Sequence, residues 1–196
     1  MKINIYGSTG IIGTATLKII QNHFPEMKVN LLCANNNVKK LLNQIEIYSP
    51  KFVYLNNKNS IKTLKNNINK KTKILNFNEL ISYLNSSKSD LSLLAISGYK
   101  SLNYLESILV NTSSLGLVSK EAIVSAGHLF KYFNKSLHNK IYPLDSEHFS
   151  IFKNSYKKSE VKNFTLTASG GPFLGKKYKS LKNVSFKMAS KHPKWK

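Results

Sequence analysis

The chain has 196 residues with 41% hydrophobic content, which fits a globular protein of one domain, or one and part of another, and its apolar runs are too short to span a membrane. The single Cys33 excludes an internal disulfide and a zinc site built from several cysteines, and it favours a reducing cytoplasm. The formal net charge of +21 comes from basic residues spread along the chain without a basic block or recognition motif, so nucleic acid is not an expected partner.

Short apolar segments alternate with amphipathic ones through the first two thirds of the chain. The pattern predicts strands at residues 2–6, 29–33, 52–55, 73–75, 91–96 and 115–118. It predicts helices between them, at residues 11–24, 38–48, 61–68, 80–84, 102–110 and 121–133. Strands that alternate with helices in this way predict an α/β fold, a Rossmann-like doubly wound parallel sheet.

The rhythm changes from about residue 142. Residues 142–144 lead into an acidic pair, residues 153–162 are charged and loop-like, and residues 163–168 alternate like a strand. The sequence therefore predicts a first domain over residues 1–141 and the beginning of a second, incomplete α+β domain over residues 142–196.

Glycines at positions 7, 10 and 13 follow the first predicted strand and precede the first predicted helix, in the sequence GSTGIIG. Such a turn lets backbone N–H groups approach a pyrophosphate, and the helix N-terminus adds its partial positive charge. The spacing is GxxGxxG rather than GxGxxG, so an ordinary tight turn is the alternative interpretation. The placement between strand and helix favours a nucleotide-binding turn.

The residues after the second strand bear on cofactor preference. NAD-binding folds usually place an acid there to hold the ribose 2′-hydroxyl, whereas this chain reads CANNNVKK from Cys33 to Lys40. Asn35–Asn37 could hydrogen-bond a 2′-phosphate, and Lys39 or Lys40 could add positive charge. The pattern favours NADP.

The sequence PLDSEHF places Asp145 and Glu147 two residues apart in a chain with nine acidic residues. If this segment is extended, the two carboxylates point to the same side and could converge on a hard cation such as Mg²⁺ or Mn²⁺. Two carboxylates rarely complete such a site, so a third ligand would be needed. The alternative interpretation is a surface turn with a helix cap, because Asp and Ser both cap well.

Three further motifs follow predicted strands or lie near the end of the sequence. SKE at 119–121 stands at the carboxyl end of a strand, where open parallel sheets bind ligands. TASGGPF at 167–173 would form an anion-binding nest, and HPKW at 192–195 combines a histidine with an aromatic residue. In this order and at these spacings, GSTGIIG, SKE, PLDSEHFSIF, TASGGPF and HPKW resemble 1-deoxy-D-xylulose 5-phosphate reductoisomerase over essentially the whole chain.

The resemblance implies an NADPH-dependent and metal-dependent enzyme that converts 1-deoxy-D-xylulose 5-phosphate to 2-C-methyl-D-erythritol 4-phosphate in non-mevalonate isoprenoid biosynthesis. It implies NADPH and Mg²⁺ or Mn²⁺ as cofactors, a small sugar phosphate as substrate, no nucleic acid or membrane partner, and a homodimeric full-length form. Residues 1–141 would be the NADPH-binding domain, and residues 142–196 the first part of the catalytic domain. Family members are about twice as long, so we expect this chain to be an N-terminal part that stops within a lid and is inactive alone.

The resemblance also implies roles for individual residues. The cofactor would contact Thr9, Gly10, Ile11, Ile12, Asn35, Asn36, Asn37, Ser119 and Glu121. The substrate would contact Lys120, Ser146, Glu147, Ser169 and His192, the last from a mobile lid that also carries Trp195. Asp145 and Glu147 would bind the metal, and together with Lys120 they would form the catalytic set.

The motifs depart from the family pattern at four positions. Ile11 and Ser119 stand where Ser and Asn are usual, and Asn35 and Asn36 stand where a glycine and a basic residue are expected. These changes could weaken cofactor contacts without changing the fold. Two rival hypotheses are a nucleotide-binding module without catalytic competence and another oxidoreductase with the same turn, such as a semialdehyde dehydrogenase. The latter needs a catalytic cysteine, and Cys33 lies at the wrong strand.

Overall fold

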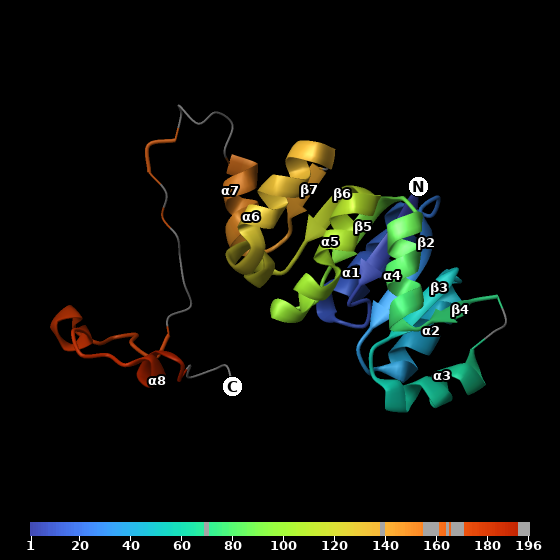
Figure 1. Ribbon diagram of the computed structural model, residues 1–196, viewed down its shortest axis with the longest axis horizontal. Helices are drawn as coiled ribbons and strands as arrows, with labels where there is room; N and C mark the ends of the chain where they lie inside the picture. The colour runs from blue at the N-terminus through green and yellow to red at the C-terminus, as the bar shows by residue number, and fades with distance from the viewer. Residues whose placement is uncertain (69–70, 138–139, 155–160, 164, 166–170, 192–196) are drawn as a thin grey trace. The chain divides into compact units, whose positions relative to one another are not determined.

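The computed structural model describes residues 1–68, 71–137, 140–154, 161–163, 165 and 171–191 (Figure 1). Its internal contacts divide the chain into two compact units, Met1–Asn154 and Ser155–Lys196.

The first unit is built on a seven-stranded sheet in which neighbouring strands are parallel, in the order β4-β3-β2-β1-β5-β6-β7. The strands are β1 (Lys2–Tyr6), β2 (Lys28–Ala34), β3 (Phe52–Leu55), β4 (Lys73–Leu75), β5 (Ser89–Leu94), β6 (Thr112–Leu117) and β7 (Lys140–Pro143). From β1 the chain winds outward to β4 and then returns to place β5 on the other side of β1. The predicted α/β, doubly wound parallel sheet is therefore confirmed.

Helices cover both faces of this sheet, and each layer has its own apolar core (Figure 1). One core takes its helical side chains from α4 (Phe77–Ser86), α5 (Leu102–Asn111) and α6 (Lys120–Leu137). The other takes them from α1 (Ile11–His23), α2 (Val38–Tyr48) and α3 (Ile61–Asn67). Among the described residues, no helix combines the length and the apolar character needed to cross a lipid bilayer.

Side-chain alternation along the strands supplies both cores. Ile3 and Ile5 of β1 lie in the core under α1 and α2, whereas Tyr6 lies in the core under α4 and α5. Strands with apolar residues on both sides are what a sheet covered on both faces requires. The short apolar runs of the sequence therefore predicted β1, β3 and β4 with the same first and last residues as in the structure. The predicted helix at residues 38–48 likewise coincides with α2.

Two elements differ from the sequence-based expectation. β7 continues the sheet at its edge, in a segment for which no strand is expected, because its exposed residues and Pro143 weaken the strand pattern. The helix α7 (Ser146–Asn154) begins directly after Asp145, so the acidic pair does not lie in an extended segment. The functional boundary after residue 141 stays a prediction.

The second unit, taken by itself, contains two short helical segments among its described residues. These are the 3-10 helix η4 (Tyr178–Leu181) and α8 (Phe186–Ala189). The side chain of Ser185 caps α8 by accepting a hydrogen bond from the backbone N–H of Met188. The predicted strand at residues 163–168 falls largely outside the described residues.

The turn between β1 and α1 is closely packed against its neighbours. The backbone N–H groups of Gly7 and Ser8 both donate to the carbonyl oxygen of Cys33, at 2.8 and 2.9 Å. Gly7 has a φ of +86°, and a Cβ there would lie 2.5 Å from the carbonyl oxygen of Ala95. A Cβ at Gly13 would lie 2.7 Å from the Cα of Ser8. Both positions therefore require glycine for reasons of space.

We expect Gly13→Ala to destabilise the chain, because the added methyl group meets backbone atoms that cannot rotate away. Overpacking of this kind costs about 1–3 kcal/mol, which corresponds to a fall in Tm of roughly 2–10 °C for a chain of this size. The measurement is thermal unfolding followed by circular dichroism without added nucleotide. Gly127→Ala in α6 is the control, because a Cβ there meets no atom within 4 Å. Equal melting temperatures for the two variants would contradict the packing of the turn.

Candidate active site

A cavity of about 430 Å³ lies at the carboxyl ends of β1, β2, β3 and β5. The topology explains its position. The winding of the sheet reverses between β1 and β5, so the connections that leave these two strands diverge and leave a crevice between them. This is where nucleotide-binding sheets of this class hold their ligand.

The glycine turn forms one wall of the cavity. Thr9 and Gly10 line it, and Gly10 is the N-cap of α1 without a side-chain cap bond. The N-terminus of a 13-residue helix therefore begins at the cavity wall, with backbone N–H groups that suit an anion. Ile11 and Ile12, also predicted to contact a cofactor, lie in the first turn of α1 and are exposed, Ile11 at 87%.

Three consecutive asparagines after β2 form a second wall. Asn35, Asn36 and Asn37 all line the cavity, as the sequence analysis predicts for a cofactor site. The side-chain oxygen of Asn35 accepts a hydrogen bond from Asn56 at 3.0 Å, and that of Asn37 accepts one from the backbone N–H of Lys40 at 3.0 Å. With these oxygens in use, the wall presents amide N–H groups as donors.

Cys33 also lines the cavity, and it is buried. Burial raises the pKa of its thiol well above the ordinary value, so the group stays protonated at neutral pH. A thiol in this state is a poor nucleophile. The rival hypothesis of a dehydrogenase with a catalytic cysteine therefore has no support from Cys33.

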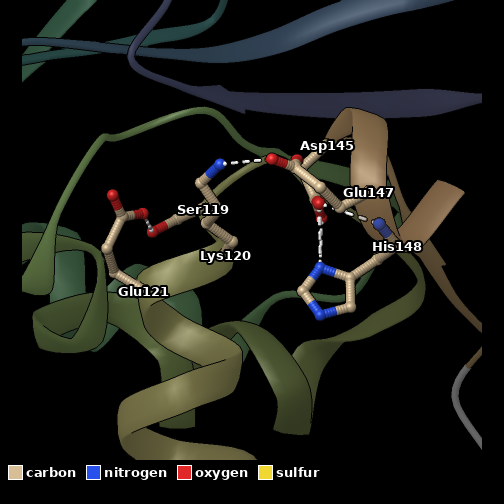
Figure 2. A network of polar contacts seen from close by, with 6 residues as sticks. All are labelled: Ser119, Lys120, Glu121, Asp145, Glu147 and His148. Atoms are coloured by element: carbon tan, nitrogen blue, oxygen red, sulfur yellow. Dashed lines mark hydrogen bonds and ion pairs between the residues drawn. The ribbon is translucent and has the colours of Figure 1, made fainter. Parts of the chain in front are cut away.

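The SKE motif begins immediately after β6, and its first residue is held inside the protein (Figure 2). Ser119 is buried, and its hydroxyl donates to the carboxylate of Glu121 at 3.0 Å. The hydroxyl of Ser101 donates in turn to Ser119 at 3.3 Å. Ser119 therefore orients Glu121 and contacts the segment that follows β5, and its predicted cofactor contact stays a prediction.

Lys120 joins this motif to the acidic pair. Its ammonium group lies 3.0 Å from a carboxylate oxygen of Glu147, a bond that links the start of α6 to the first turn of α7 (Figure 2). The hydrogen bond from Glu147 raises the pKa of Lys120, and the same bond lowers the pKa of Glu147. Both groups are therefore charged at neutral pH. Because the pair is partly exposed to water, it contributes little to stability and serves mainly to place the two side chains.

Asp145 is the cap of α7 and the partner of His148 (Figure 2). Its carboxylate accepts a hydrogen bond from the backbone N–H of His148 at 3.0 Å, and the Nδ1 atom of the imidazole lies 2.8 Å from both carboxylate oxygens. Partial burial would raise the pKa of Asp145, but the bonds from His148 outweigh it and hold the pKa below its ordinary value. Asp145 thus stays ionised.

The acidic pair supplies oxygen ligands but not a complete metal site. Asp145 and Glu147 offer the carboxylate oxygens that Mg²⁺ and Mn²⁺ prefer. Among the described residues, no group of three or more His, Cys, Asp or Glu side chains could hold a metal ion. The donor chemistry therefore fits a hard divalent cation, with further ligands required. Ser146 is the first residue of α7, between the two acids.

Several predicted site residues come together and others cannot be placed. Lys120, Asp145 and Glu147 lie in one polar network, and the segment after β5 connects it to the cavity, since Ala95–Ser97 line the cavity and Ser101 contacts Ser119. The predicted substrate ligands Ser169 and His192 lie outside the described residues, as does Trp195.

Sequence reasoning missed one cavity residue within β3 and the cavity residues that follow β3 and β5. They are Tyr54, Asn56, Ala95, Ile96, Ser97, Lys100, Asn103 and Tyr104. No local motif marks them, because they reach the site only through the strand order, which puts β3 beside β2 and β5 beside β1. A topology drawn from the alternating pattern, with the second half of the sheet on the far side of β1, would have found this segment.

Comparisons with known proteins agree with this geometry. The family model of 1-deoxy-D-xylulose 5-phosphate reductoisomerase matches residues 3–127, and the model of the C-terminal domain of the same enzyme matches residues 141–196. The reductoisomerase of Pelagibacter ubique is 39% identical over 99% of this chain and 51% of its own length. That of Thermodesulfovibrio yellowstonii is 38% identical over 100% of this chain and 52% of its own length.

Solved structures give the same result. The reductoisomerase of Zymomonas mobilis in complex with NADPH has a TM-score of 0.78 at 26% identity, over 94% of this chain and 50% of that one. A reductoisomerase in complex with NADPH, fosmidomycin and magnesium has a TM-score of 0.74 at 29% identity, over 100% of this chain and 52% of that one. The chain thus spans about half the length of the curated relatives it matches. Fold, motifs and comparisons agree that the chain belongs to the 1-deoxy-D-xylulose 5-phosphate reductoisomerase family.

Proposed function

We propose that this chain provides the NADPH-binding part and two metal-binding carboxylates of an enzyme that converts 1-deoxy-D-xylulose 5-phosphate to 2-C-methyl-D-erythritol 4-phosphate, a step of non-mevalonate isoprenoid biosynthesis. One observation carries the proposal. A nucleotide-sized cavity at the reversal point of the sheet is joined through Ser101 and Ser119 to a network of Lys120, Glu147 and Asp145. The whole enzyme would be a cytoplasmic homodimer.

The cavity fits the nicotinamide cofactor. A Cβ at Gly7 or Gly13 would clash with the backbone, so only glycine allows the tight turn. A turn of this kind brings the backbone close to a pyrophosphate. Thr9 and Gly10 would bind the phosphates at the start of α1, with Ile11 and Ile12 beside them. Asn35–Asn37 would donate to the adenosine phosphate, and the absence of an acid after β2 favours NADPH over NADH.

The metal would be held by Asp145 and Glu147, as Mg²⁺ or Mn²⁺, with remaining ligands from outside the described residues and from the substrate. When bound, the cation supplies Lewis-acid polarisation of the substrate's carbonyl and hydroxyl oxygens, and NADPH supplies the hydride. The fit rests on the chemistry of the two donors, which are both ionised oxygen ligands.

The residues of the chain would bind and orient the substrate. Lys120 stays protonated because of Glu147, so it would act as a cation and hydrogen-bond donor to substrate oxygens rather than as a base. Glu121, oriented by Ser119, would contact the cofactor. Ser146 would contact the substrate from the start of α7, and Ser169 and His192 are proposed as further substrate ligands.

A nucleotide-binding module without catalytic competence is the second candidate function. It shares the cavity but gives no reason for the ion pair between Lys120 and Glu147 or for the approach of α7 to α6. The metal-binding experiment below distinguishes the two candidates, because a module that binds only nucleotide is not expected to bind a cation at the acidic pair.

We expect Gly10→Asp to abolish NADPH binding while the chain remains folded. The new carboxylate would lie at the N-terminus of α1 and repel the pyrophosphate. The fold should persist, because Asp is a favourable N-cap residue and Gly10 already has an extended conformation, with φ −72° and ψ 176°. Titration by nucleotide fluorescence measures the affinity, with Gly127→Asp in α6 as the control. Unchanged NADPH affinity in Gly10→Asp would place the nucleotide site elsewhere.

We expect Glu147→Gln and Asp145→Asn each to weaken Mn²⁺ binding by about tenfold or more, which is about 1.4 kcal/mol for the loss of one charged ligand. Mn²⁺ binding to the unmodified chain should itself be weak, because at this site the described residues offer two carboxylates, and Lys120 competes with the metal for that of Glu147. Isothermal titration calorimetry measures the affinities.

Glu106→Gln is the matched control for this experiment, since Glu106 is exposed on α5. Asn retains the capping function of Asp145, so α7 should keep its start in Asp145→Asn. Equal Mn²⁺ affinity in all of these proteins would show that the acidic pair is not the metal site.

A further inference from the structure

The nucleotide cavity contains a charged residue to which neither the sequence motifs nor the family resemblance assigns a role. Among the described residues that line the cavity, Lys100 is the only one with a charged side chain. It lies in the 3-10 helix η2 (Tyr99–Ser101), which follows β5 and precedes α5. It therefore comes from the side of the reversal point opposite to the asparagines that follow β2.

The asparagine wall is built to receive an anion. Asn35 and Asn37 use their side-chain oxygens inside the protein, for Asn56 and for the backbone of Lys40. Their amide N–H groups remain as donors, which suits a phosphate oxygen better than a ribose hydroxyl that must also donate. Asn36 lines the same wall and is exposed. Neutral donors alone, however, leave the charge of a phosphate uncompensated.

The two lysines that the sequence analysis considers for this charge do not line the cavity. Lys39 lines a separate surface hollow formed by α2 and α3, together with Glu46 and Asn67. Lys40 is the third residue of α2, and its backbone N–H is bonded to Asn37. Neither belongs to the cavity wall, so the lining of the cavity offers no support for the charge expected from the segment after β2.

We propose that Lys100 reads the 2′-phosphate of NADPH, opposite the donors of Asn35–Asn37, and so sets the preference for NADPH over NADH. The inference rests on the proposed function, since it takes the cavity to be the cofactor site. A lysine ammonium is a compact cation that binds phosphate as a point charge. None of the described acidic side chains forms an ion pair with Lys100 that would compete with the phosphate.

The alternative position for this charge is the pyrophosphate, which NADH and NADPH share. Backbone N–H groups at the start of α1 already serve that position. A lysine on the pyrophosphate would support both nucleotides equally, whereas a lysine on the 2′-phosphate supports NADPH alone. The ratio of the two affinities therefore distinguishes the two positions.

The experiment compares Lys100→Met with Lys39→Met in the full chain, by fluorescence titration with NADPH and with NADH. Both variants lose one positive charge from an exposed lysine, so the general effect of net charge is matched. We expect Lys100→Met to weaken NADPH binding by about tenfold or more, the range of a charge-assisted hydrogen bond, and to change NADH binding by less than about twofold. Lys39→Met should leave both affinities unchanged.

Each outcome decides a different point. Lys100 does not bind the 2′-phosphate if Lys100→Met weakens the binding of NADPH and NADH equally, or leaves both unchanged. The same conclusion follows if Lys39→Met changes the two affinities as Lys100→Met does. Lys100→Arg should retain the preference, since it keeps the charge. If the unmodified chain binds neither nucleotide, the proposed function fails and the inference fails with it. If the unmodified chain binds NADPH and Lys100→Met keeps the preference, the inference about Lys100 alone is wrong.

Discussion

The carbonyl oxygen of Cys33 accepts two backbone hydrogen bonds, from Gly7 and from Ser8, and this junction of β1 with β2 fixes the geometry on which the site depends. It turns the chain sharply after β1, and Gly13 then lets α1 pack against the backbone of the same turn. The start of α1 is placed at the reversal point of the sheet as a result. Space for a cavity remains at that point because two of the turn residues that line it, Gly7 and Gly10, have no side chain.

The same junction connects the cofactor cavity to the acidic pair. Gly7 lies against the carbonyl of Ala95, so the segment after β5 is held beside the turn, and its Ser101 reaches Ser119 at the start of the SKE motif. Lys120 then contacts Glu147 on α7. Under the proposed function, hydride transfer would require cofactor and substrate in defined positions, and the continuous set of bonded elements between the two halves of the site would provide them.

The regular part of the fold could be predicted from the sequence because strands buried on both faces appear as short apolar runs, as in β1 and β3. β7 lies at an edge, is half exposed and includes Pro143, so it lacks that signal. The sequence allowed Asp145 either to lie in an extended segment as a metal ligand or to cap a helix. Its hydrogen bonds to His148 in the structure show that it caps α7. Lys100 could not be singled out among thirty basic residues, because strand order alone brings it to the cavity.

The two outermost strands have a consequence for how copies of this chain behave in concentrated solution. β4 has three residues and β7 has four, both begin with a lysine, and β7 includes a proline that lacks a backbone N–H. A sheet margin that is short, positively charged and poor in donors is a weak template for adding a strand from another molecule. The parallel sheet is thus protected against edge-to-edge aggregation by the same residues that made its last strand hard to recognise.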